Sequence, residues 1–279
     1  VVVLHTACGE EEPVSPTPNI GTPNDSTAAG GGNNPDTGKK PDDDNTAGGS
    51  DTPTETEETT SDARLEVYQK IYAASDIYVE GDFVIIETNG RPDHKSPYYV
   101  ETSWEGELHE AYNGSNDQFR LNPNRIGEFT YTFKIPLNPE EATRHQATPM
   151  GAIGVSLNGV PFYNQYAAPD EPLTNEINSF DQYNGHPTGN ANYHYHIEPL
   201  YLTETVGKDV LLGFLLDGFP VYGPTESGKL VSENDLDEYH GHTHATSDYP
   251  DGIYHYHITS NDPYINGNGY FGTPGTFSQ

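Results

Sequence analysis

Histidines alternate with tyrosines in two short segments of the chain. Each segment reads Tyr-His-Tyr-His, with His194 and His196 in the first and His255 and His257 in the second. Side chains point to alternate faces of a β-strand, so the two histidines of a pair share one face and can offer two ring nitrogens to one metal ion. The tyrosines then face the other way. The spacing predicts metal chemistry on a pair of strands.

A Gly-His pair precedes each segment and supplies a third histidine. His186 comes before His194 in the first case, and His242 comes before His255 in the second. A turn can return such a residue to the strand that follows it. We therefore expect the metal ligands to be His186, His194, His196, His242, His255 and His257.

Neighbouring polar residues could support these ligands. Asp181 and Asp237 are predicted either to bind the metal or to accept a hydrogen bond that fixes an imidazole tautomer. Tyr195 and Tyr256 are further candidates for hydrogen bonds to the ligands, and additional ligands could come from His94, His240 and His244. The alternative for any one His-x-His pair is a half-buried strand with hydrogen-bonded histidines and packed tyrosines.

The available ligand types narrow the choice of metal. Cys8 is the only cysteine and the chain has one Met, which excludes a blue-copper site and disfavours a copper(I) thioether site. Imidazole with carboxylate suits Zn, Cu(II), Ni or non-haem Fe. We favour Zn and place Cu(II) second. The sequence leaves open whether the histidines form two sites or converge on one.

Self-comparison shows that the histidine segments belong to an internal repeat. Three blocks recur in the same order. The spacing between the second and third blocks is five residues longer in the second copy, which indicates an insertion there. The matched blocks are 153–163 with 212–222, 181–186 with 237–242, and 193–197 with 254–258. The repeated units therefore span 153–199 and 212–260.

These blocks resemble the YHYH domain family of bacterial secreted and surface proteins. The resemblance rests on the doubled Tyr-His-Tyr-His, the Gly-His pairs and the Asn-Gly-Val-Pro and Asp-Gly-Phe-Pro turns, and it runs from about residue 78 to 275. Family members often carry Cys where this chain has Tyr183 and Tyr239, so a thiol role at these positions is absent. The resemblance implies a β-rich extracytoplasmic domain that binds metal.

Short apolar and aromatic runs separated by Gly, Pro, Asn and Asp favour a mainly β fold. Asn158-Gly159 and Asp217-Gly218 indicate tight turns. A helical spacing runs from Leu65 to Tyr72, and one helical turn is expected at 139–142. The expected strands are 77–80, 82–88, 98–102, 127–135, 152–157, 193–197, 210–216 and 254–259.

Composition divides the chain in two. All Phe, Trp and Tyr residues follow residue 63, whereas the preceding segment is rich in Pro, Gly, Thr and acidic residues. Such a segment buries too little apolar surface to offset the entropy of ordering. We expect a disordered acidic tether over 9–63 and a single β domain over 64–279.

The formal net charge of −31 argues against a nucleic-acid partner, because Lys and Arg supply the phosphate contacts.

The first eight residues resemble the end of a bacterial lipoprotein signal peptide. An apolar run is followed by Ala7 and Cys8, the lipid site that the resemblance implies, although Leu4 lies one place early for the usual spacing. The acidic residues that follow resemble a Bacteroidetes-type signal for surface lipoproteins. We expect an extracytoplasmic lipoprotein of the outer membrane or cell surface that touches the membrane only through its lipid. The alternative is that Cys8 is an ordinary thiol.

Three functions remain open from the sequence. The first is a surface protein whose histidines hold one or two transition-metal ions. The second is a metal-dependent hydrolase or oxidoreductase, in which an open coordination position activates water or a substrate oxygen. The third is an adhesion or glycan-binding module, since tyrosine-rich surfaces can stack on sugars.

Overall fold

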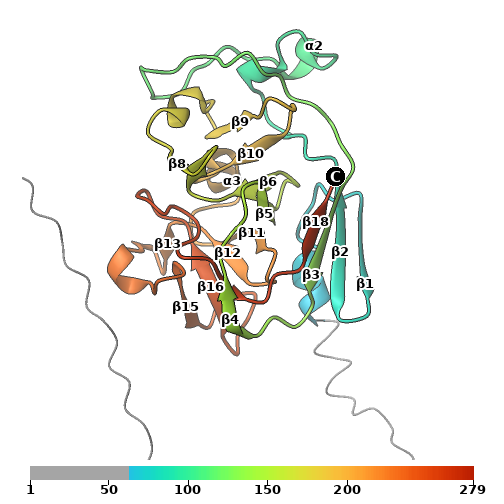
Figure 1. Cartoon of the computed structure of the whole chain (residues 1–279), viewed down its shortest axis with the longest axis vertical. Coiled ribbons are helices and arrows are strands. Elements are labelled where there is room, and N and C mark those ends of the chain that lie inside the picture. The colour runs from blue at the N-terminus through green and yellow to red at the C-terminus, as the bar shows by residue number, and fades with distance from the viewer. Residues whose placement is uncertain (1–62) are drawn as a thin grey trace, which may run out of the picture. The chain divides into compact units, whose positions relative to one another are not determined.

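The two repeats build one eight-stranded sheet in the computed structural model, which describes residues 63–279. Its strand order is β15-β16-β12-β11-β5-β6-β10-β9, so the repeats occupy opposite halves (Figure 1). The first repeat contributes β5 (Ala152–Ser156), β6 (Pro161–Tyr163), β9 (Gly185–Pro187) and β10 (Tyr193–Tyr195). The second contributes β11 (Leu211–Leu215), β12 (Pro220–Tyr222), β15 (Gly241–His244) and β16 (Ile253–His257).

Each repeat pairs its strands in the same way. The first two strands form an antiparallel hairpin, the second pairs in parallel with the strand that carries the Tyr-His motif, and that strand pairs antiparallel with the Gly-His strand. The halves meet where β5 and β11 pair antiparallel, with Val155 opposite its repeat equivalent Phe214. A local twofold relation therefore connects the two halves of the sheet.

Glycine is required at this junction on both strands. A Cβ atom on Gly154 would lie 2.3 Å from the carbonyl oxygen of Phe214, and one on Gly213 would lie 2.2 Å from the carbonyl oxygen of Val155. Both contacts are with backbone atoms, which cannot rotate away. The two glycines allow the halves to approach closely.

The two predicted turns accept hydrogen bonds from residues of β2 (Phe83–Thr88) and of the helical segment 63–68. Gly159 and Gly218 have φ angles of +75° and +88°, which glycine adopts without strain. Thr88 Oγ1 donates a hydrogen bond to the carbonyl oxygen of Gly159 (2.9 Å), and Tyr68 Oη donates one to the carbonyl oxygen of Gly218 (3.1 Å). Both equivalent turns therefore contact the part of the chain that precedes the repeats.

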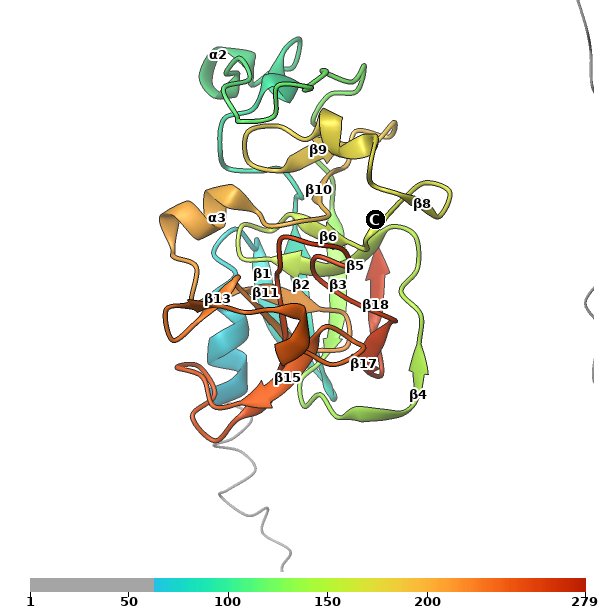
Figure 2. The ribbon, with the colours of Figure 1, turned by 90° about the vertical axis from the view of Figure 1, so that its left-hand side faces the viewer.

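The second sheet has four antiparallel strands in the order β1-β2-β3-β18 and lies beside the larger sheet (Figures 1 and 2). In β3 the buried residues Tyr131, Phe133 and Ile135 alternate with more exposed ones. One apolar core contains side chains from both sheets. The strands are β1 (Asp76–Glu80), β2 (Phe83–Thr88), β3 (Tyr131–Pro136) and β18 (Thr276–Ser278).

Short elements connect and flank the sheets. Residues 63–68 are helical, and α3 (Leu200–Thr205) joins the two repeats. Two-stranded pairs are formed by β4 (Glu141–Gln146) with β17 (Tyr270–Gly272), β7 (Tyr166–Ala167) with β8 (Glu171–Pro172), and β13 (Thr225–Glu226) with β14 (Lys229–Leu230). The remaining elements are α2 (Glu105–Leu108) and the 3-10 turns η1 (Pro97–Tyr99), η2 (Glu176–Ser179) and η3 (Glu233–Asp235).

The predicted mainly β fold is confirmed, with three local exceptions. The expected strand 127–135 begins only at Tyr131, because residues 127–130 pair with no strand of the described part of the chain. The expected strand 98–102 is wrong, because Pro97 starts a 3-10 turn that the Ser96 side chain caps. The expected helical turn at 139–142 is also wrong, because β4 begins at Glu141 and pairs with β17. Cys8 and all but the last residue of the expected tether lie outside the described residues. Among residues 63–279, no helix has the length and apolar character to cross a membrane.

The junction glycines give a first test. Replacing Gly213 by Ala should lower the free energy of unfolding by at least about 2 kcal/mol, because the new methyl group would overlap the backbone of β5. Urea unfolding of the full chain measures the change. Gly106→Ala, at a position with open space around it, is the matched control and should be close to neutral. Equal midpoints for the two variants would contradict the close approach described here.

Candidate metal centres

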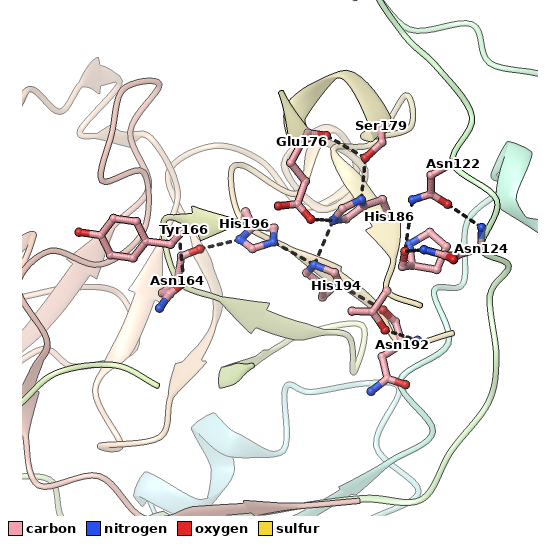
Figure 3. A network of polar contacts seen from close by, with 12 residues as sticks. Asn122, Asn124, Asn164, Tyr166, Glu176, Ser179, His186, Asn192, His194 and His196 are labelled. Atoms are coloured by element: carbon pink, nitrogen blue, oxygen red, sulfur yellow. Dashed lines mark hydrogen bonds and ion pairs between the residues drawn. The ribbon is translucent and has the colours of Figure 1, made fainter. Parts of the chain in front are cut away.

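The first histidine cluster consists of His186, His194 and His196. Strands β9 and β10 pair with His186 directly opposite His194, and His196 follows directly after β10, two residues from His194 and on the same side. The Nε2 atoms of His186 and His194 are 3.1 Å apart, and those of His194 and His196 are 2.9 Å apart. Figure 3 shows the three rings converging on one another. The sequence-predicted ligands of the first repeat are thus brought together.

Hydrogen bonds at the opposite ring nitrogens fix the tautomers of this cluster. Nδ1 of His194 contacts the carbonyl oxygen of Asn192 (3.0 Å), and Nδ1 of His196 contacts that of Asn164 (2.5 Å). A carbonyl oxygen cannot donate, so both Nδ1 atoms carry the proton. Ser179 Oγ donates to the carbonyl oxygen of Glu176 (2.8 Å) and is left to accept from His186 Nδ1 (2.7 Å). All three Nε2 lone pairs therefore face inward.

Burial keeps the rings neutral. Burial lowers the pKa of His186 to about 3 and that of His196 to about 4, and it also lowers the pKa of His194. Three neutral imidazoles with their lone pairs about 3 Å apart repel one another unless a cation lies between them. A tetrahedral ion with metal–nitrogen distances near 2.0–2.1 Å would separate its ligand nitrogens by about 3.3 Å. The His186–His194 and His194–His196 nitrogen distances of 3.1 and 2.9 Å are close to this value.

The second histidine cluster consists of His242, His255 and His257, joined by Glu226. Strands β15 and β16 pair with His242 opposite His255, and their Nε2 atoms are 3.1 Å apart. Nε2 of His257 is buried and has no hydrogen-bond partner. The ligand atoms of the four residues lie within 4.8 Å of one another. An orphaned buried nitrogen that faces other ligand atoms is expected of a metal site.

The same anchors hold the second cluster. Nδ1 of His242 contacts the carbonyl oxygen of Asp235 (3.2 Å), Nδ1 of His255 that of Ile253 (3.0 Å), and Nδ1 of His257 that of Gly223 (2.8 Å). The three acceptors occupy equivalent places in the two repeats. The acceptor for the Gly-His histidine lies at the end of a 3-10 turn. The acceptor for the first histidine of the Tyr-His strand lies at or just before the start of that strand, and the acceptor for the second lies just after β6 or β12. The repeat has thus kept the orientation of each imidazole as well as its identity. Burial lowers the pKa of all three rings, that of His255 to about 4.

The carboxylates nearest to the two clusters belong to Glu176 and Glu226, which the sequence does not predict as site residues. Glu176 Oε1 lies 3.3 Å from His186 Nε2, and its Oε2 is buried without a partner. Glu226 Oε1 lies 3.8 Å from His242 Nε2. Glu176 is on η2, whereas Glu226 is on β13, so the two do not occupy equivalent positions. Self-comparison could not have found them for this reason.

The two predicted aspartates, Asp181 and Asp237, accept hydrogen bonds from the backbone of their turns and not from the imidazoles. Asp181 Oδ1 accepts from the backbone N–H groups of Tyr183 and Gly185, and its Oδ2 accepts from Tyr193 Oη (2.8 Å). Asp237 makes the equivalent bonds, including one from Tyr254 Oη (2.9 Å). Neither carboxylate makes a hydrogen bond to a cluster histidine in the described part of the chain. The expectation that they bind metal or orient an imidazole is corrected accordingly.

Tyr195 and Tyr256 face away from the clusters, as the alternation of the strand requires. Tyr195 Oη contacts His94 Nε2 (3.0 Å) and Asn158 Nδ2 (3.2 Å), and Tyr256 Oη donates to Asp217 Oδ2 (2.6 Å). Their expected contact with the metal ligands is therefore wrong. They connect the Tyr-His strands to the residues of the two tight turns.

Of the three histidines predicted as additional ligands, only His244 lies beside a cluster. His94 is buried behind the first cluster among tyrosines, and His240 occupies a left-handed turn position (φ +73°) where it contacts Thr259 and Glu233. Neither joins a cluster. His244 lies at the rim of the second cluster, where its Nδ1 is 3.0 Å from Glu226 Oε1.

The neutral clusters predict an acid-sensitive metal-free protein. Because folding lowers the histidine pKa values from about 6.5 to near 4 or below, the neutral rings favour the folded state fully above pH 6.5. That contribution is lost as the pH falls from about 6.5 towards 4. The urea midpoint measured with a chelator present should fall over this interval. His194→Phe with His255→Phe should make the decline shallower, and an unchanged slope would contradict the assignment.

Comparison with known proteins finds a family match, which covers the part of the chain that carries both clusters. The family described as YHYH protein matches residues 132–229 and 225–269, a region that contains both clusters. No curated protein matches the chain, and neither does any solved structure. The matched region is shorter than the predicted likeness and leaves out the segment before residue 132. Residues 132–269 of this chain belong to the YHYH protein family.

Proposed function

We propose that the chain binds two transition-metal ions, one in each histidine cluster. The observation that carries the proposal is the convergence of unprotonated Nε2 atoms, each on an imidazole whose Nδ1 proton is committed to a fixed acceptor. Such an arrangement is costly for a cluster without a cation and is repeated at equivalent positions. Three imidazoles and an adjacent carboxylate favour zinc, with Cu(II) as the second choice.

The burial of the tyrosines argues against an adhesion or glycan-binding role. Eight tyrosines are among the largest fully buried side chains of the described residues. A surface that stacks on sugars needs exposed aromatic faces grouped together. The exposed large tyrosines, Tyr72, Tyr78 and Tyr166, lie on or near different elements.

Metal stoichiometry tests the proposal. The full chain loaded with zinc and freed of excess ion should hold two ions by mass spectrometric metal analysis. His194→Ala and His255→Ala should each remove one ion, because each deletes the ligand that lies opposite the Gly-His histidine. His109→Ala, at an exposed position outside both clusters, should keep two. A chain without bound zinc, or variants that keep two ions, would refute the proposal.

We also propose that Cys8 carries the lipid that holds this domain at the cell surface. The support is the apolar run 1–4, the small residue Ala7 directly before Cys8 and the acidic residues that follow Cys8. Metabolic labelling with palmitate should label the chain, and Cys8→Ser should abolish the label. A label that persists in the variant, or is missing from both proteins, would show that Cys8 is an ordinary thiol.

A further inference from the structure

The two clusters differ in how they are covered. In the first cluster the buried ring of Phe180 packs edge-on against His186 at 4.8 Å between centroids and stacks on His196 at 5.7 Å. Phe180 precedes the turn aspartate of its repeat. The residue that precedes the turn aspartate of the second repeat is Leu236, which is partly exposed. The aromatic cover of the first cluster thus has no aromatic counterpart at the equivalent position of the second.

A cavity of about 320 Å³ opens at the second cluster. Its lining includes His255, His257 and Glu226, so it borders three of the four residues of the second cluster. This volume lies at the lower end of the range for sites that bind small molecules.

The wall of this cavity comes from the insertion. Ala245, Thr246 and Ser247 line it, and they lie in the segment between the Gly-His and Tyr-His blocks that is five residues longer in the second repeat. The wall is ordered by Thr246 Oγ1, which is 2.7 Å from Tyr222 Oη and accepts from the backbone N–H of Tyr249 (3.1 Å). The feature that breaks the repeat in sequence therefore shapes the space beside one metal site.

The lining indicates what the cavity would accept. Hydroxyl groups of Ser227 and Ser247 can donate to or accept from a ligand, and the carboxylates of Asp209 and Glu226 would balance the charge of a divalent ion, so the site has little need of an anionic ligand. The net charge of −31 acts in the same direction. A small, uncharged molecule that carries hydroxyl groups matches this environment, and one of its oxygens can reach the metal.

We propose that the second cluster is a ligand-binding metal site, in which a small uncharged hydroxylated molecule binds in this cavity and gives an oxygen to the ion, while the first cluster is closed. This inference rests on the proposed binding of two metal ions. The two clusters occupy equivalent positions in the repeats but have different roles. The first ion holds β9, β10 and their neighbouring turn together, and the second is open to exchange with solvent.

The test uses the full chain loaded with Co(II) and titrated with ethylene glycol, a small uncharged probe with two hydroxyl oxygens. Wild-type protein and His194→Ala, which keeps the second cluster, should show a shift in the visible cobalt absorption. His255→Ala, which keeps the first, should bind cobalt without responding to the probe. A response in His255→Ala, or none in a cobalt-loaded His194→Ala, overturns the proposal.

Variants of the cavity wall leave both clusters intact and guard against misfolding of the ligand variants. Ser247→Trp should fill the cavity and abolish the response while two cobalt ions remain bound. Asp251→Trp, in the same segment but outside the lining, should respond as the wild type does. A full response from Ser247→Trp overturns the proposed location. If the wild-type chain binds no cobalt, the proposed metal binding itself fails, which is a different outcome from cobalt that ignores the probe.

Discussion

The close approach of three imidazole nitrogens is the interaction on which this domain depends. Nε2 lone pairs lie about 3 Å apart along the first cluster and between His242 and His255 in the second, and each ring is prevented from turning by a hydrogen bond at its other nitrogen. Those acceptors come from three separate elements of the repeat, so one site fixes the relative positions of a hairpin, a 3-10 turn and a strand. A cation that satisfies the nitrogens also stabilises this arrangement.

Side-chain alternation explains why much of the site could be predicted. Alternation puts His194 and His196 on the same side of the extended Tyr-His segment, and the turn after β9 brings His194 back beside His186. The antiparallel register then places His186 opposite His194. The same reasoning holds for His242 and β16. Local pattern and pairing therefore suffice to identify the imidazoles of both clusters.

The Nδ1 acceptors and the nearby carboxylates depend on contacts that leave no recognisable pattern in the sequence. The Nδ1 acceptors are almost all backbone carbonyls, which any residue can supply. Glu176 and Glu226 reach their clusters from different elements, so the repeat conceals them. Asp181 lies close to the ligands in sequence, but its oxygens accept from the turn and from Tyr193, because tight turns recruit carboxylates for their own N–H groups. Proximity along the chain gave the wrong partner there.

The pairing of β5 with β11 has a consequence for the origin of the chain. Equivalent strands meet antiparallel at Val155 and Phe214, which is the contact that two identical subunits make across a twofold axis. A single repeat would expose this edge and its unpaired backbone groups, so it would be expected to pair with a copy of itself. Joining two such copies through α3 turns a symmetric dimer into one chain. From then on each substitution alters one half alone, and a symmetric pair of sites becomes free to diverge.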